Sequence, residues 1–174
     1  SGDMVANKLS QREMTAEATK LGTQAASVAI ANKELMRFIP LAEKAIDNVP
    51  RSQWRPLNQL IQAGENTWSP EQKSLVIANR SVLNAFSQLI QRGAPTVHSM
   101  QEAEALINTA DSPAVYKAAM KQLRLEGEQA EAGLSDARND LLERARGIGS
   151  EASPAGPQPG HVEGGYKFKG GDPA

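Results

Sequence analysis

The chain has 174 residues, with 19 Lys and Arg against 20 Asp and Glu, a formal net charge of −1 at pH 7. Hydrophobic residues make up 40% of it and aromatic residues 4%, and it contains no cysteine. This apolar fraction argues against a wholly disordered chain. The missing cysteines exclude disulfides, thiol catalysis and thiolate metal sites. No apolar run reaches about 18 residues, so we predict no transmembrane helix, and we expect no signal peptide.

Composition divides the chain near Gly147. Residues 147–174 hold 8 of the 14 glycines and 4 of the 10 prolines, with almost no aliphatic side chains. Such a segment buries too little apolar surface to offset its ordering entropy, so we predict a flexible tail. We assign residues 10–146 to a helical bundle domain. We expect residues 1–9 to be a tag remnant or the lead-in of an excised fragment.

The first predicted helix begins at Ser10, which forms a capping box with Glu13, and Pro40 kinks or ends it. Asn32 interrupts its apolar seam. It either fixes register or oligomeric state as a buried polar residue, or is half-exposed near the helix end. The seam recurs at alternating steps of four and three residues, a spacing typical of coiled-coil-like packing: Met14, Ala18, Leu21, Ala25, Val28, Asn32, Leu35 and Ile39.

Two short helices and one long helix are predicted in the middle of the chain. A short helix follows Ser52 or Gln53, with Trp54, Leu57 and Ile61 on one face. A long helix starts with Ser69 as its N-cap and ends at the Gly-Ala-Pro sequence of residues 93–95. Ser99 and Glu102 then open a second short helix as far as about Asn108. The stripe of the long helix comprises Leu75, Val76, Val82, Leu83, Phe86, Leu89 and Ile90.

The last predicted helix spans 113–146 and starts with Ser112 and Pro113. Small residues in its seam would let a partner helix approach closely. No stretch of five residues alternates as a strand would, so we predict an all-α fold. We expect an elongated bundle of three long and two short helices, whose seams pair within one chain or between chains of a homo-oligomer. The seam comprises Tyr116, Met120, Leu123, Gly127, Ala130, Leu134, Ala137 and Leu141.

Catalytic patterns are not apparent. His98 and His161 lack metal-spaced partners, and we interpret His98 as a solvated loop residue. No nucleophile elbow or phosphate-binding glycine loop occurs. The glutamates at 102, 104, 126, 128 and 131 are interpreted as solvated helix faces. We therefore predict a non-enzymatic protein without metal, cofactor or small-molecule substrate. Residues 1–146 carry 17 basic and 17 acidic residues, which argues against a general nucleic-acid binder.

Lys117, Lys121 and Arg124 form one basic strip on the last predicted helix. It either contacts a phosphate, a lipid headgroup or an acidic partner, or it pairs with nearby acids such as Glu128. Nucleic-acid or membrane contact through this strip is therefore an open alternative.

The chain ends with aromatic and basic residues alternating between two glycine pairs. Tyr166, Lys167, Phe168 and Lys169 form the centre of a candidate docking peptide, residues 164–173. It could add a strand to a partner or stack on it, or it could be a terminus without consequence.

This ending, Gly-Tyr-Lys-Phe-Lys-Gly-Gly-Asp-Pro, resembles the C-terminal signature of virion proteins of tailed bacteriophages or prophages. The run from Ile46 to Trp54, with Asn58, and the Ala78-Asn79 and Leu83-Asn84-Ala85 sequences are similar to the helical region that precedes that signature. The likeness covers about residues 20–174. A terminal segment with a Trp, usual in that family, does not follow Ala174, which favours the fragment interpretation.

The resemblance implies a structural or internal virion protein of the DNA-ejection type, located in the particle or, during assembly, in the host cytoplasm. Its partners would be other virion proteins or further copies of itself. The alternative is a cellular helical binding module, such as an adaptor, chaperone or secretion-associated domain. A wall-degrading enzyme and a membrane-adsorbing variant of the virion protein are further hypotheses.

Overall fold

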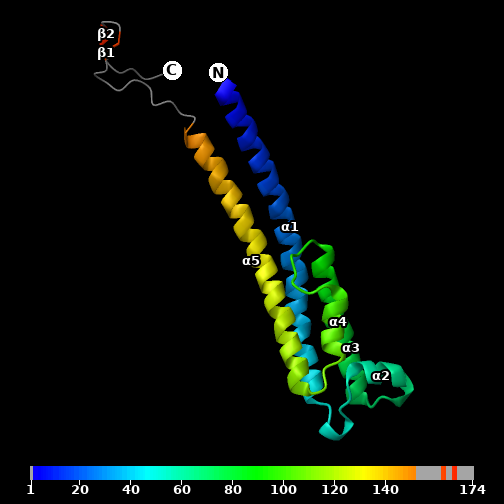
Figure 1. The fold of residues 1–174 in the computed structure, drawn as a ribbon. Helices are drawn as coiled ribbons and strands as arrows, with labels where there is room; N and C mark the ends of the chain where they lie inside the picture. The colour runs from blue at the N-terminus through cyan, green and yellow to red at the C-terminus, as the bar shows by residue number, and fades with distance from the viewer. Residues whose placement is uncertain (1, 152–161, 164–165, 168–174) are drawn as a thin grey trace. The chain divides into compact units, whose positions relative to one another are not determined.

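The computed structural model describes the backbone of residues 2–151, 162–163 and 166–167, and side chains in residues 2–148. Its elements in chain order are α1 (Gly2–Asp47), η1 (Arg51–Gln53), α2 (Leu57–Ala63), η2 (Glu65–Thr67), α3 (Pro70–Gln91), α4 (Met100–Asn108), α5 (Pro113–Glu151), β1 (Val162–Glu163) and β2 (Tyr166–Lys167). The strands β1 and β2 form a two-residue antiparallel pair. Three long and two short α-helices confirm the predicted all-α class (Figure 1).

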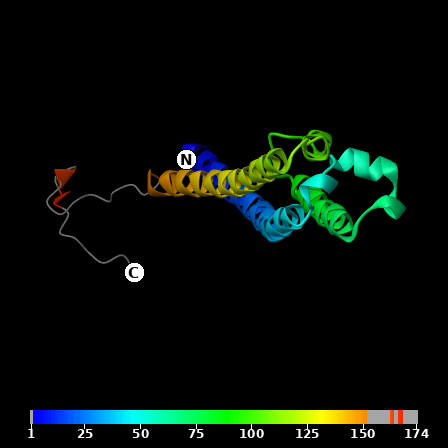
Figure 2. The same cartoon turned by 90° about the horizontal axis from the view of Figure 1, so that it is seen from below.

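The chain divides into two compact units. The core unit comprises Ala18–Asn139, and the terminal unit comprises Ser1–Glu17 together with Asp140–Ala174. Within the core unit, α5 runs antiparallel to α1, and α3 and α4 pack beside them (Figure 1). The short helix α2 lies where α1 ends and α5 begins (Figures 1 and 2).

The core is built largely from the predicted apolar stripes. Burial of large aliphatic and aromatic side chains supplies most of the stability of such a bundle, at about 25 cal/mol for each Å² of apolar surface. The largest fully buried apolar side chains come from all five helices: Leu35, Ile39, Ile46, Leu57, Leu75, Phe86, Leu89, Ile107, Tyr116, Met120 and Leu123.

Local start signals place three helices as predicted. Ser69 accepts a hydrogen bond from the Gln72 backbone N–H, and the Gln72 side chain accepts one from the Ser69 backbone. Ser99 and Glu102 form the same reciprocal capping box at the start of α4. The Ser112 hydroxyl accepts from the Val115 N–H at 3.3 Å, which caps α5. These contacts satisfy backbone N–H groups that have no partner inside the helix.

The end of α3 is fixed against α1. Gly93 follows the helix with a φ of +82°, a conformation that glycine adopts without strain. Its carbonyl oxygen accepts a hydrogen bond from Gln24 Nε2 at 3.0 Å. Arg92 Nη1 donates to the Ser27 carbonyl oxygen, also at 3.0 Å. The predicted stop signal is therefore correct, and α1 supplies the partners.

The first helix is longer than predicted: its predicted start is wrong, and Pro40 does not end it. It begins at Gly2 rather than at Ser10, so the predicted capping box does not form and residues 2–9 are helical. Pro40 lies inside the helix, which continues to Asp47. Proline removes one backbone hydrogen bond, but Ala42, Ala45 and Ile46 beyond it are buried in the core, and this burial holds the last turns in place.

The helix predicted after Ser52 is also different. Residues 51–53 form a 3₁₀ turn, and α2 begins only at Leu57, after Pro56. Leu57 and Leu60 are buried, whereas Ile61 is 44% exposed, so the predicted face is wrong at Ile61. Because α2 is only seven residues long, the packing of two leucines three residues apart determines its orientation.

Candidate functional site

The two predicted seams are mostly buried within a single chain in the core unit. Most of their residues in the core unit are almost fully buried, among them Val28, Asn32, Leu35, Tyr116, Met120, Leu123, Gly127 and Leu134. Leu21, in the core unit, is half-buried, as are Met14 and Leu141 in the terminal unit. The sequence left open whether the seams pair within or between chains. In the core unit the buried seam residues face the other helices of the same chain, whereas Ala137 is exposed.

Asn32 and Gly127 meet where α1 crosses α5. Asn32 is 4% exposed, which excludes the half-exposed interpretation. Its Nδ2 donates to Glu131 Oε2 at 2.7 Å, whereas its Oδ1 is buried without a hydrogen-bond partner. A β-carbon at position 127 would overlap Asn32 Oδ1 and approach Leu35 Cδ2 to 3.3 Å. The small residue in the α5 seam therefore makes room for the polar residue in the α1 seam.

The prediction that Glu126 lies on a solvated helix face is wrong, because this residue is only 2% exposed. Its Oε2 accepts a hydrogen bond from the His98 backbone N–H at 3.1 Å, and its Oε1 contacts His98 Nδ1 and lies 3.4 Å from Gln122 Nε2. The His98 side chain is 29% exposed, so His98 is not a freely solvated loop residue. One carboxylate thus fastens the α3–α4 connection to α5. A position beside the α5 seam was the only sequence signal for this role.

Tyr116 carries a second polar group into the core. Its hydroxyl donates to Asn79 Oδ1 at 3.1 Å, and Asn79 Nδ2 lies 3.4 Å from Asn108 Oδ1. Burial raises the pKa of Tyr116 well above its usual value, and the negative charge of Glu43 acts in the same direction. The phenol therefore stays neutral and serves as a hydrogen-bond donor between α5 and α3.

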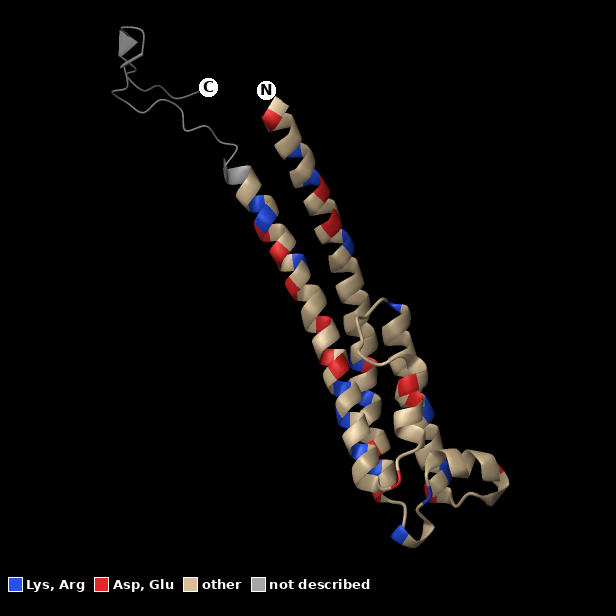
Figure 3. Cartoon of the chain, in the orientation of Figure 1, with Lys and Arg blue, Asp and Glu red and all other residues tan. Residues whose placement is uncertain are grey.

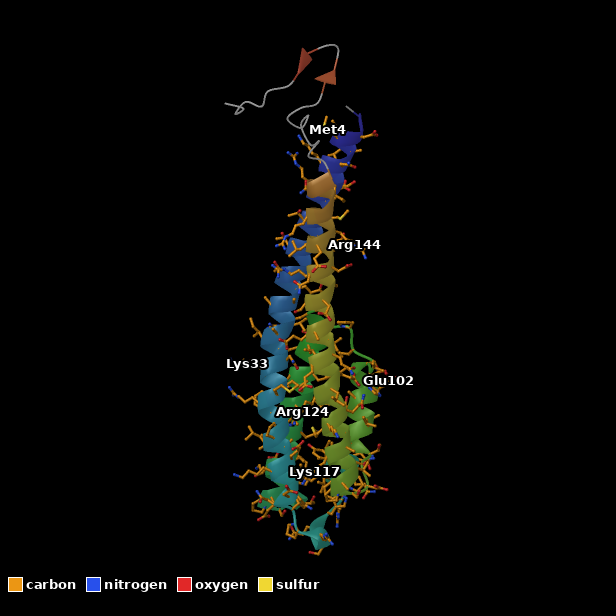
Figure 4. All side chains as sticks on the ribbon, turned by 90° about the vertical axis from the view of Figure 1, so that its left-hand side faces the viewer. Met4, Lys33, Glu102, Lys117, Arg124 and Arg144 are labelled. Atoms are coloured by element: carbon orange, nitrogen blue, oxygen red, sulfur yellow. The ribbon has the colours of Figure 1, made fainter. Side chains whose placement is uncertain are left out.

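The predicted basic strip is partly neutralised by α1. Lys117 Nζ lies 2.5 Å from Asp47 Oδ1, and Arg124 Nη2 lies 3.8 Å from Glu43 Oε1. Lys121 is exposed and forms no ion pair among the described residues. Lys117 and Arg124 lie on one face of α5, where acidic and basic residues are mixed (Figures 3 and 4). The acids of α1, rather than the predicted Glu128, are the partners.

A cavity of about 530 Å³ lies beside the start of α5. Its lining comes from the connection between α1 and α2 and from the start of α5: Arg51, Trp54, Ser112, Pro113, Ala114 and Lys117. Trp54 Nε1 donates to the Asp111 carbonyl oxygen at 2.8 Å, which joins the two segments and orients the indole. The volume is within the range of small-molecule sites, about 300–1,000 Å³. No sequence pattern predicted this cavity, because its lining residues come from two segments far apart in the chain.

The terminal unit exposes apolar side chains at the start of α1. Met4, Val5 and Leu9 are 53%, 59% and 53% exposed, and no described side chain of residues 2–17 is buried. Of the predicted docking peptide, only the backbone of Tyr166 and Lys167 is described, paired with Val162 and Glu163. Phe168 and Lys169 lie outside the described residues.

Among residues 2–148, no group of three or more His, Asp or Glu side chains is arranged to hold a metal ion. None of the described helices combines the length and apolar character needed to cross a membrane. Comparison with protein families, with curated proteins and with solved structures gives no match.

Proposed function

We propose that this chain is a non-catalytic helical association module of a tailed-phage or prophage virion protein, of the internal, DNA-ejection type. The observation that carries the association role is the exposed apolar surface at the start of α1, formed by Met4, Val5 and Leu9. The assignment to a virion depends on the resemblance of the 164–173 sequence and of the helical region before it. The chain would act in the particle, or in the host cytoplasm during assembly.

Helix association is favoured because Val5 and Leu9 are one helical turn apart. Residues at positions i and i+4 share a helix face, and a partner helix commonly covers such a pair. The core unit has buried most of its own seam residues, so these are not free to bind a partner. The exposed start of α1 is an apolar surface that is available to other virion proteins or to a second copy.

A non-catalytic role is favoured by the contacts of the buried Glu126 and the half-buried Glu131. The Glu126 carboxylate accepts a hydrogen bond from the His98 backbone N–H, and the Glu131 carboxylate accepts one from Asn32 Nδ2. Both carboxylates join helices or loops of the core unit and do not line the cavity described above.

The test is light scattering coupled to size-exclusion chromatography on the full chain and on a Val5→Glu/Leu9→Glu variant. We expect the wild-type chain to form a defined oligomer, alone or with proteins of its particle, and the double variant to lose it. An Ile77→Glu variant is the matched control, because Ile77 is 55% exposed on α3 and outside the proposed surface. A version ending at Arg146 separates the contribution of the tail.

A chain that stays monomeric at every concentration and has no affinity for proteins of its particle would contradict the proposal. Equal loss of association in the Ile77→Glu control would also contradict it, because the effect would then not be specific to the start of α1.

A further inference from the structure

The cavity beside the start of α5 has a chemical character that the association role does not require. Two of its six lining residues, Arg51 and Lys117, are cations, and none is an acid. Trp54, Pro113 and Ala114 contribute apolar surface. A cavity with cations and an apolar wall suits a ligand that has both an anionic and an apolar part.

Arg51 is the cation that is available to a ligand. It is exposed and forms no ion pair among the described residues. Its planar guanidinium can donate two parallel hydrogen bonds to a phosphate or a carboxylate. Lys117 is already paired with Asp47, but an ammonium group has three N–H donors and can contact a second anion.

Trp54 supplies an aromatic surface whose position is fixed. Its indole N–H is bonded to the Asp111 carbonyl oxygen at 2.8 Å, so this polar group is already satisfied and the ring is held in place. A flat aromatic ligand can pack against such a ring with little further loss of side-chain freedom.

We propose that this cavity binds a small organic anion in which a flat aromatic group carries a phosphate or a carboxylate. The anionic group contacts Arg51 and Lys117, and the aromatic group occupies the apolar part beside Trp54. This site is independent of the proposed association surface, which lies at the start of α1.

The first experiment follows the fluorescence of Trp54 in a full-length Trp68→Phe variant, where it is the only tryptophan. Phenyl phosphate and benzoate are the two probes, and they distinguish the two anionic groups. Inorganic phosphate and benzyl alcohol are controls for the anion alone and the aromatic group alone. Calorimetry on the wild-type chain repeats the titration in case the Trp68→Phe variant does not fold.

We expect at least one of the two aromatic anions to bind about tenfold more tightly than either control, since charge-assisted contacts and ring packing both contribute. Failure of both probes to bind overturns the proposal. Inorganic phosphate or benzyl alcohol binding as tightly as the better probe also overturns it.

Two pairs of variants test the placement. Arg51→Gln should weaken binding about tenfold, whereas Arg55→Gln should not, because Arg55 is exposed but does not line this cavity. Ala114→Leu should block the cavity while keeping both cations. Ala118→Leu, at an exposed position one turn further along α5, is its control. Equal effects within either pair would assign binding to general surface attraction and overturn the site.

Discussion

Gly127 shows how a single missing side chain shapes this bundle. Most glycines in helices lower stability, because they increase the freedom of the unfolded chain. At position 127 the space that a β-carbon would fill is taken by Asn32 Oδ1. Gly133, six residues further along the same helix, has no neighbouring atom within 4 Å of that place. We therefore expect substitution by alanine to have opposite effects on stability at the two glycines.

We expect Gly127→Ala to lower the free energy of unfolding by about 1–3 kcal/mol, because the added methyl group forces Asn32 or Leu35 to shift. Gly133→Ala should raise it by up to about 1 kcal/mol through helix propensity. Urea unfolding followed by circular dichroism measures both. A stabilising Gly127→Ala variant would show that the contact with Asn32 is not restrictive.

Tyr116 predicts an alkaline limit to stability. The raised pKa means that the folded chain keeps the phenol neutral, whereas in the unfolded chain it ionises near pH 10. The unfolded state therefore releases a proton that the folded state retains. The stabilising contribution is complete below about pH 10 and is lost as the pH rises further.

A Tyr116→Phe variant isolates this effect from the titration of lysines. At pH 7 we expect it to be less stable by about 1 kcal/mol, because the hydrogen bond to Asn79 is lost. Above about pH 10 its stability should fall less steeply than that of the wild-type chain. Urea unfolding between pH 7 and 11 provides the comparison, and parallel curves for the two proteins would refute the assignment.

At the scale of elements, the α3–α4 connection depends on one carboxylate of α5. Glu126 accepts the backbone N–H of His98 and contacts its ring, and the capping box of Ser99 and Glu102 begins at the next residue. The accepted hydrogen bonds lower the pKa of Glu102. The start of α4 is therefore held by a buried contact to α5 and by its own cap.

We expect Glu126→Gln to lower the free energy of unfolding by about 1–3 kcal/mol, since an amide cannot accept all the hydrogen bonds that the carboxylate accepts. Hydrogen exchange in α4 should increase more than exchange in α1. The control is Glu128→Gln, an exposed change on the same helix, with an expected effect within about 0.5 kcal/mol. Uniform acceleration of exchange in all helices would mean that Glu126 does not act locally on α4.

At the scale of the whole molecule, burial is concentrated in the core unit. Among the described residues, every buried side chain except that of Ala145 belongs to residues 18–139. Apolar burial dominates stability, so residues 18–139 hold most of the stabilising contacts.

A chain limited to residues 18–139 should therefore fold and unfold cooperatively, with a thermal midpoint within a few degrees of that of the full chain. Circular dichroism melts of both chains measure this. A broad, non-cooperative transition would show that the ends of α1 and α5 stabilise the core unit more than their small buried surface predicts. If the proposed function is correct, this shorter chain should also lack the association that depends on Val5 and Leu9.

Local signals in the sequence predicted much of the fold. The alternating seam spacings marked α1 and α5, and serine caps followed by proline or by an acid marked the starts of α3, α4 and α5. These predictions succeed because caps and helical periodicity depend on residues three or four positions apart. The wrong start at Ser10 has a related cause: residues 2–9 suit a helix as well, so the local signal did not define the end.

The sequence by itself determined the helical class, most members of the seams and most helix starts. Only the tertiary structure decided which polar residues are buried and where the cavity lies. Asn32 and Glu131 are 99 residues apart, His98 and Glu126 are 28 apart, and the cavity joins the α1–α2 connection to the start of α5. From the sequence alone, a polar side chain on the flank of a helix is predicted to be solvated. It becomes buried only when the tertiary structure packs a second segment against it. Its burial is a property of that pair and not of its own sequence neighbourhood.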